Sequence, residues 1–115
     1  MSGQNISLLA LSGTAAGAIT TCHFVTPGFA EAGAGVNTLG VCRQTAVLGD
    51  KITVDVLGTA VVEAGAAVNA GDSLMTDATG RALTWAVSGA KVALALQAAT
   101  AAGQLIEVLL IPNVA

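Results

Sequence analysis

Apolar and polar residues alternate most regularly between residues 51 and 57. A period of two residues is typical of a strand with one buried and one solvated face. Gly58 follows and permits a bend or a bulge, so the apolar run 59–62 either pairs back on this strand or continues it around a corner. The apolar positions are Ile52, Val54 and Val56, and the polar positions are Lys51, Thr53 and Asp55.

Other short apolar runs are rich in β-branched residues and are separated by Gly, Pro, Asn and Asp, which favours strands joined by turns. Residues 86–102 are alanine-rich and offer a helix as the alternative, but β-branched residues and glycine interrupt them. Roughly eight short strands predict an all-β (mainly β) fold, a small β-sandwich or barrel with at most a short helix. The strand segments are 19–25, 38–42, 51–57, 59–62, 73–76, 81–87, 92–98 and 105–111, with a turn at 77–80.

The chain nearly repeats itself, because residues 14–57 shifted forward by 54 positions lie without a gap over residues 68–111. Gly35 then falls on Gly89. Few residues are identical, and in a chain rich in Ala and Gly chance matches are the alternative to duplication. The repeat predicts one pseudo-duplicated β domain over residues 14–115, preceded by residues 1–13 as an extended N-terminal arm or edge strand.

The composition is unusually apolar for a protein that works as a single soluble copy. Only 10% of the 115 residues are charged, and the mean hydropathy is +0.78. Excess apolar surface marks an interface, so we expect other subunits to cover much of it. No uninterrupted apolar run reaches the roughly 20 residues that a membrane span needs. The first residues also lack the basic start of a secretory signal, so we expect a cytosolic protein with no membrane partner.

The charged and sulfur-containing residues argue against further functional classes. The formal net charge is −3 and the four basic residues are scattered, which gives no stripe for binding nucleic acid. Cys22 and Cys42 are too few for a disulfide framework or a zinc cluster. We expect two buried thiols, with a Cys22–Cys42 disulfide as the less favoured alternative in a cytosolic protein.

Catalysis is not predicted. The lone His23 lies beside Cys22, but adjacent strand residues point to opposite faces, so it cannot readily act as a base for that thiol. It could reach Cys42, yet no orienting Asn or Asp stands near a recognisable signature. The aspartates at 50, 55, 72 and 77 lie at strand ends and turns, where this side chain bonds nearby backbone N–H groups. We therefore expect no enzyme, no metal and no cofactor.

Residues 62–74 look like the beginning of a biotinyl or lipoyl carrier domain, which is also a small pseudo-duplicated β-sandwich. Such a carrier needs a lysine at an exposed hairpin turn, because the lysine amine holds the cofactor. The turn that follows here is Asp77-Ala78-Thr79-Gly80 and has no lysine. The carrier function therefore lacks the residue that performs the chemistry.

The order and spacing of the turns and strands over residues 38–111 resemble the capsid decoration (cement) proteins of tailed bacteriophages. The resemblance implies a β-rich capsid stabilisation protein without enzymatic activity that binds the outside of the bacteriophage head. Its partner would be the major capsid protein, commonly clamped by a homotrimer, and it would lie on the virion surface after assembly in the host cytoplasm. Residues 28–37 are Gly- and Ala-rich and depart from the family pattern. The matching elements are Gly40-Val41-Cys42, Gly49 to Val54, Gly58, Ala70 to Leu74, Asp77 to Gly80, Val92 to Ala99, Gly103 and Leu105 to Leu109.

In that family the N-terminal segment often adds to a strand of the capsid, which supplies main-chain hydrogen bonds with little demand on side-chain identity. Two other functions stay open: another virion structural protein such as a tail or head-joining subunit, and a lipoyl/biotinyl-like module without the carrier lysine. The capsid-binding arm that the resemblance implies consists of Ser2, Gly3, Gln4, Asn5, Ile6, Ser7, Leu8, Leu9, Ala10 and Leu11.

Overall fold

The fold is all-β in the computed structural model, which describes residues 6–86 and 88–111. No helix forms in these residues, and hence none long enough to cross a membrane. The prediction of an all-β fold with about eight short strands is confirmed. The strands are β1 (Ser7–Thr14), β2 (Phe24–Val25), β3 (Gly40–Cys42), β4 (Lys51–Glu63), β5 (Ser73–Thr76), β6 (Ala82–Thr84), β7 (Ala93–Ala95) and β8 (Leu105–Leu110).

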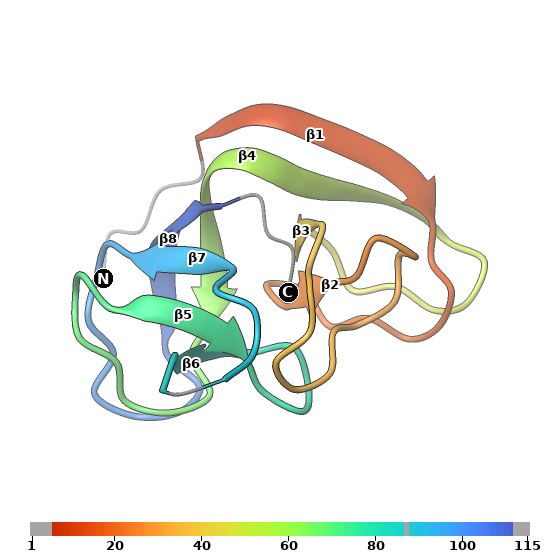
Figure 1. The fold of residues 1–115 in the computed structure, drawn as a ribbon. Helices are drawn as coiled ribbons and strands as arrows, with labels where there is room; N and C mark the ends of the chain where they lie inside the picture. The colour runs from red at the N-terminus through yellow and green to blue at the C-terminus, as the bar shows by residue number, and fades with distance from the viewer. Residues whose placement is uncertain (1–5, 87, 112–115) are drawn as a thin grey trace.

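One long strand, β4, organises the sheet. Its first half pairs with β1 on one edge and with β3 on the other, and its second half pairs with β8. The strand order is β2-β3-β4-β8-β7-β5-β6, with β1 added on β4. Figure 1 shows β1 and β4 as a long curved ribbon that arches over the other strands, and the sheet closes into a nearly complete barrel. The run 59–62 therefore continues β4, through Gly58 with a φ of 101°.

The strand pairings occur twice along the chain. Leu11 of β1 pairs with Val54, and in the same way Ala60 pairs with Val108 of β8. The pairing of β2 with β3 likewise recurs as the pairing of β5 with β7. We call residues 10–55 the first unit and residues 59–109 the second unit. The two halves of β4 belong to different units, so the strand joins them.

The two units are related by more than one shift. Positions in β1 and β2 correspond to positions 49 residues further on, as Leu11 does to Ala60, whereas Val54 corresponds to Val108, 54 residues further on. The reason lies in two connections of each unit. Residues 75–92 include β6 and are four residues more than the equivalent connection 26–39, and residues 96–104 are one residue more than the equivalent connection 43–50. A gap-free shift of 54 therefore aligns only the last strand segment of each unit, and descent from a duplication stays a prediction.

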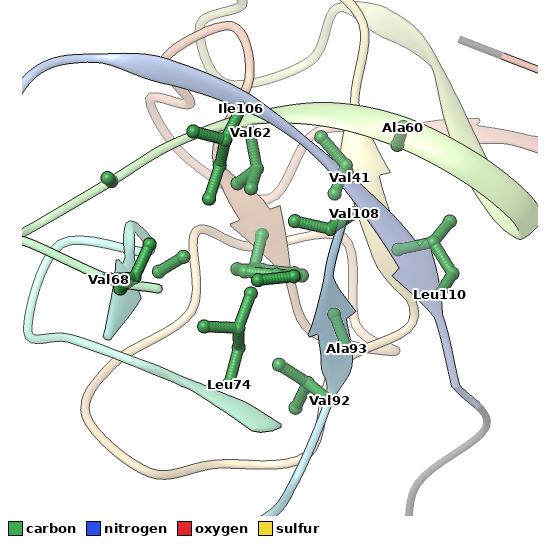
Figure 2. Packing of buried hydrophobic residues seen from close by; sticks show 14 of the residues in the cluster. Val41, Ala60, Val62, Val68, Leu74, Val92, Ala93, Ile106, Val108 and Leu110 are labelled. Atoms are coloured by element: carbon green, nitrogen blue, oxygen red, sulfur yellow. The ribbon is translucent and has the colours of Figure 1, made fainter. Parts of the chain in front are cut away.

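Two apolar clusters form the core. The larger one spans both units, because Phe24 and Val41 of the first unit pack among residues of β4, β5, β7 and β8. Figure 2 shows its labelled side chains converging between the strands, with Val62 of β4 beside Ile106 of β8. The smaller cluster lies in the first unit and consists of Ala15, Ile19, Val25, Cys42, Ala46, Ile52 and Val54.

The strand predicted over residues 19–25 is shorter than expected. Only Phe24 and Val25 form β2, while Ile19 makes an isolated bridge with Ala46. Between them Cys22 has a φ of 63°, a left-handed conformation that side-chain-bearing residues rarely adopt and that interrupts an extended strand. Apolar β-branched residues thus indicated burial correctly here, but not continuous strand structure.

Candidate functional site

One exposed apolar segment consists of β1 and Ile6, which directly precedes it. Among the described strands only β4 pairs with it, so its outer edge carries unpaired backbone groups. Leu8 is 77% exposed, and Ile6, Leu9 and Leu11 are exposed as well. Of the predicted capsid-binding arm, residues 6–11 are this segment, whereas Ser2, Gly3, Gln4 and Asn5 lie outside the described residues.

The second unit shows how unusual this exposure is. Ala60 and Val62 of β4 hold the positions that Leu11 and Gly13 hold in β1, and both are fully buried. Adjacent residues of a strand point to opposite faces, so the joint exposure of Ala10 and Leu11 leaves both faces of β1 uncovered. The strand also carries no charged residue, although natural edge strands usually carry charges against unwanted pairing.

A second exposed apolar area lies on β8 and the end of β7. We call Leu96, Leu105 and Leu109 the leucine face; their exposed fractions are 43%, 41% and 40%. The equivalent positions of the first unit are all charged. Leu96 donates its N–H to Glu107 as Arg43 does to Thr53, and the ladder registers place Leu105 on Lys51 and Leu109 on Asp55. Three charges of one unit are thus three exposed leucines in the other.

The charged positions of the first unit that correspond to the leucine face include a buried carboxylate, Asp55. Arg43 donates to Asp55 Oδ1 from Nε at 2.7 Å and from Nη2 at 2.6 Å. The Asp55 side chain is 2% exposed and that of Arg43 is 43% exposed. The alternation of β4 predicts Asp55 on a solvated face, and that expectation is wrong, because Asp55 is buried beside its cross-strand neighbour Val41 and its ion-pair partner Arg43. Asp55 therefore does not cap a turn.

An open cavity of about 280 Å³ lies against the same ion pair and is lined by Cys22, Val41, Cys42, Arg43, Asp55 and Val61. Both cysteines are free thiols, but the prediction that both are buried holds only for Cys42, because Cys22 is partly exposed. Burial raises the pKa of the Cys42 thiol, whose Sγ donates to the Gln44 carbonyl at 3.0 Å, so this sulfur is held in the protonated, unreactive form. Within residues 6–86 and 88–111 no group of His, Cys, Asp and Glu has the arrangement of a metal site.

The remaining candidate groups hold the structure together. Both ring nitrogens of His23 bond to oxygen atoms, so the imidazole is not available as a base for Cys42. Asp50 and Asp72 accept backbone N–H groups within their turns, as expected. Asp77 does the same in the turn where a carrier domain would hold its lysine. That turn packs on β2 through the Phe24 N–H, which donates to the Gly80 carbonyl at 2.7 Å.

The chain is similar to a known protein family and to a solved structure. A family model described as phage cement protein matches residues 4–110. Among solved structures, the chain is similar to the N base of the head fiber gp8.5 of bacteriophage phi29, with a TM-score of 0.72 at 17% identity over 91% of this chain and 95% of that one. No curated protein sequence matches the chain. At this identity the structural match establishes a shared fold.

Proposed function

The chain belongs to the phage cement protein family, and from that premise we propose that it binds the outer surface of a phage head and stabilises the shell of major capsid protein. The observation that carries the proposal is the exposed, uncharged edge of β1. The head-fiber fold of the phi29 protein supports a place on the head. A tail or head-joining role is the alternative, and we assign no catalysis to the chain.

Strand β1 is the surface that we assign to the capsid. An apolar edge with no charge pairs readily with other strands, and natural proteins keep such edges covered. Addition of a capsid strand would satisfy its free N–H and C=O groups and bury Ile6, Leu8 and Leu9. We include Ser2 to Asn5 in the same arm. Because each docked copy would bridge subunits that must separate together, many modest contacts would hold the shell tightly.

The leucine face is the surface that we assign to sister copies of the chain. Its counterpart in the first unit shows that the same strand positions are compatible with charged residues, so folding alone does not require Leu96, Leu105 and Leu109. Exposed apolar residues in place of charges are typical of an interface. A homotrimer around this face fits the apolar composition and a three-fold position on a head.

The capsid assignment is tested with expanded, empty heads of the phage that encodes the chain. We expect the wild-type protein to bind at micromolar concentration and to raise the temperature at which heads disrupt. Leu8→Lys should abolish binding without unfolding the protein, since Leu8 is 77% exposed. The matched control is Leu48→Lys, at a residue 73% exposed outside β1.

Three results would count against these assignments. Absence of wild-type binding removes head stabilisation as the function, and equal binding of both lysine variants removes β1 as the contact. Rings or tubes of the isolated protein in electron microscopy would favour a tail or head-joining subunit. The leucine face is tested separately by sedimentation of the variant Leu96→Arg/Leu109→Asp, which copies the charged pair of the first unit. It should sediment as a monomer, and an unchanged oligomer would exclude this face.

A further inference from the structure

The chain has a single histidine, and it is buried where the two units meet. The Nδ1 atom of His23 lies 2.6 Å from the carbonyl oxygen of Thr79 and 3.1 Å from Oε1 of Glu31. Its Nε2 atom lies 3.0 Å from Oε1 of Glu63. These partners come from the turn between β5 and β6, from the connection after β2 and from the end of β4. One side chain thus joins three separate segments.

The geometry favours the protonated form of this imidazole. A neutral imidazole has one N–H donor, and its other nitrogen is an acceptor. Here both nitrogens face oxygen atoms, and the Thr79 carbonyl accepts hydrogen bonds but cannot donate one. Only the imidazolium, with two N–H groups, satisfies the Thr79 carbonyl and the carboxylates of Glu31 and Glu63 together.

The charges around His23 also favour its proton. Glu31 and Glu63 contact the ring directly, and Arg81 lies behind Glu63 with Nη1 at 3.6 Å from Oε2. Arg81 is itself paired with Asp77, at 2.9 Å from Nε to Oδ2. Burial lowers the pKa of His23, but the bonds to Glu63, to the Thr79 carbonyl and to Glu31 outweigh it, and the pKa lies above the ordinary value of 6.5.

The turn that His23 contacts is pressed closely against β2. Gly80 has a φ of 84°, and a Cβ atom there would lie 3.0 Å from the Phe24 carbonyl oxygen and 3.4 Å from Cβ of His23. The Phe24 N–H donates to the Gly80 carbonyl. With the bond from His23 to Thr79, two hydrogen bonds therefore join this turn of the second unit to His23 and Phe24 of the first.

We propose that His23 is a protonated latch, which fastens the β5–β6 turn to β2 and opens when alkaline pH removes the proton. An imidazole that has lost its proton leaves one nitrogen facing an oxygen atom without a donor. The sign follows from the raised pKa of the folded protein. The latch stabilises the protein fully below pH 6.5, the ordinary value, and this stabilisation is lost as pH rises through the folded-state pKa.

The single histidine makes the test direct, because its ring proton gives one resolved NMR titration. We expect a pKa above 6.5 in the wild type and a clear downward shift in Glu63→Gln, which keeps an oxygen but removes the charge. Glu107→Gln is the matched control, since Glu107 lies on β8 outside this cluster, and its backbone N–H donates to Gln97. A wild-type pKa at or below 6.5, or equal shifts in the two variants, would overturn the proposal.

The opening of the latch has its own readouts. Urea midpoints of the wild type should fall between pH 6 and pH 9, whereas His23→Gln should show a much smaller fall. The protection factor of the Phe24 amide, corrected for the intrinsic exchange rate, should drop over the same range while that of the Val62 amide changes little. A pH dependence that is the same with and without His23 contradicts the latch. If His23→Gln does not fold, the amide measurement on the wild type decides.

Discussion

Replacing Arg43 with leucine should destabilise the protein more than replacing its partner, Asp55. Arg43→Leu leaves a carboxylate whose side chain is 2% exposed without its bidentate donor. Asp55→Leu leaves a guanidinium that is 43% exposed and that water can reach. The double variant has a direct precedent in the chain, because the equivalent positions of the second unit are Leu96 and Leu109.

The magnitude follows from the exposure of the pair. Breaking a fully buried ion pair costs about 3–5 kcal/mol, whereas an exposed pair contributes about 0–1 kcal/mol. Asp55 is buried but Arg43 is half exposed, so water entering beside the carboxylate recovers part of the loss. We expect Arg43→Leu to lower the free energy of unfolding by about 2 kcal/mol, or Tm by about 8 °C for a domain of this size. The double variant should lie within about 1 kcal/mol of the wild type.

The assay is a double-mutant cycle by urea denaturation at pH 7, followed through far-ultraviolet circular dichroism, with the wild type, both single variants and the double variant. The coupling energy should be about 2 kcal/mol, because leucine at both positions removes the isolated charge. Two results would refute the reasoning. One is an Arg43→Leu variant as stable as the wild type, and the other is a double variant that loses the sum of the two single losses.

Three further outcomes are expected. Gly40→Ala should prevent folding, because its Cβ would collide with the carbonyl oxygen of Asp55, whereas Gly17→Ala, with open space around it, should melt like the wild type by circular dichroism. Leu74→Ala should cost about 2–5 kcal/mol in urea denaturation, since Leu74 is fully buried in the larger cluster. Burial alone would raise the pKa of Asp77, but the hydrogen bonds from Arg81 and Thr79 outweigh burial, and the pKa lies below the ordinary value of 3.8. The stabilisation by the ionised Asp77 side chain is therefore present above pH 4 and is lost on acidification. Between pH 5 and pH 2 the free energy of unfolding of Asp77→Asn should therefore fall less than that of the wild type, as measured by urea denaturation.

Hydrophobic alternation was sufficient to locate the core-facing residues of β4. Ile52 and Val54 are buried as predicted and Val56 is partly buried against the same cluster, because successive side chains of a strand point alternately to the two faces of the sheet. The same rule failed at Asp55, since it assumes that the opposite face meets water. Here Arg43, distant in sequence, supplies the charge that permits a carboxylate to be buried. The only indication of this ion pair in the sequence was Arg43, a basic residue directly after the predicted strand 38–42.

The surfaces and the His23 cluster were less accessible to sequence reasoning. An apolar run such as residues 6–11 indicates a strand, but burial depends on what packs over it, which the run does not encode. The partners of His23 stand 8, 40 and 56 positions away and meet it only through the barrel. The sequence therefore argued against catalysis by this histidine but did not indicate its partners.

The shared strand β4 has a consequence for how the protein unfolds. Since Lys51 to Asp55 complete the first unit and Thr59 to Glu63 begin the second, no linker separates them. Cutting the chain near Gly58 would leave each fragment with half of a strand and an opened core. We therefore expect the two units to unfold in one cooperative transition, in which neither is lost or refolds alone. A protein of this kind, docked on a phage head as we propose, would keep or lose its whole fold at once.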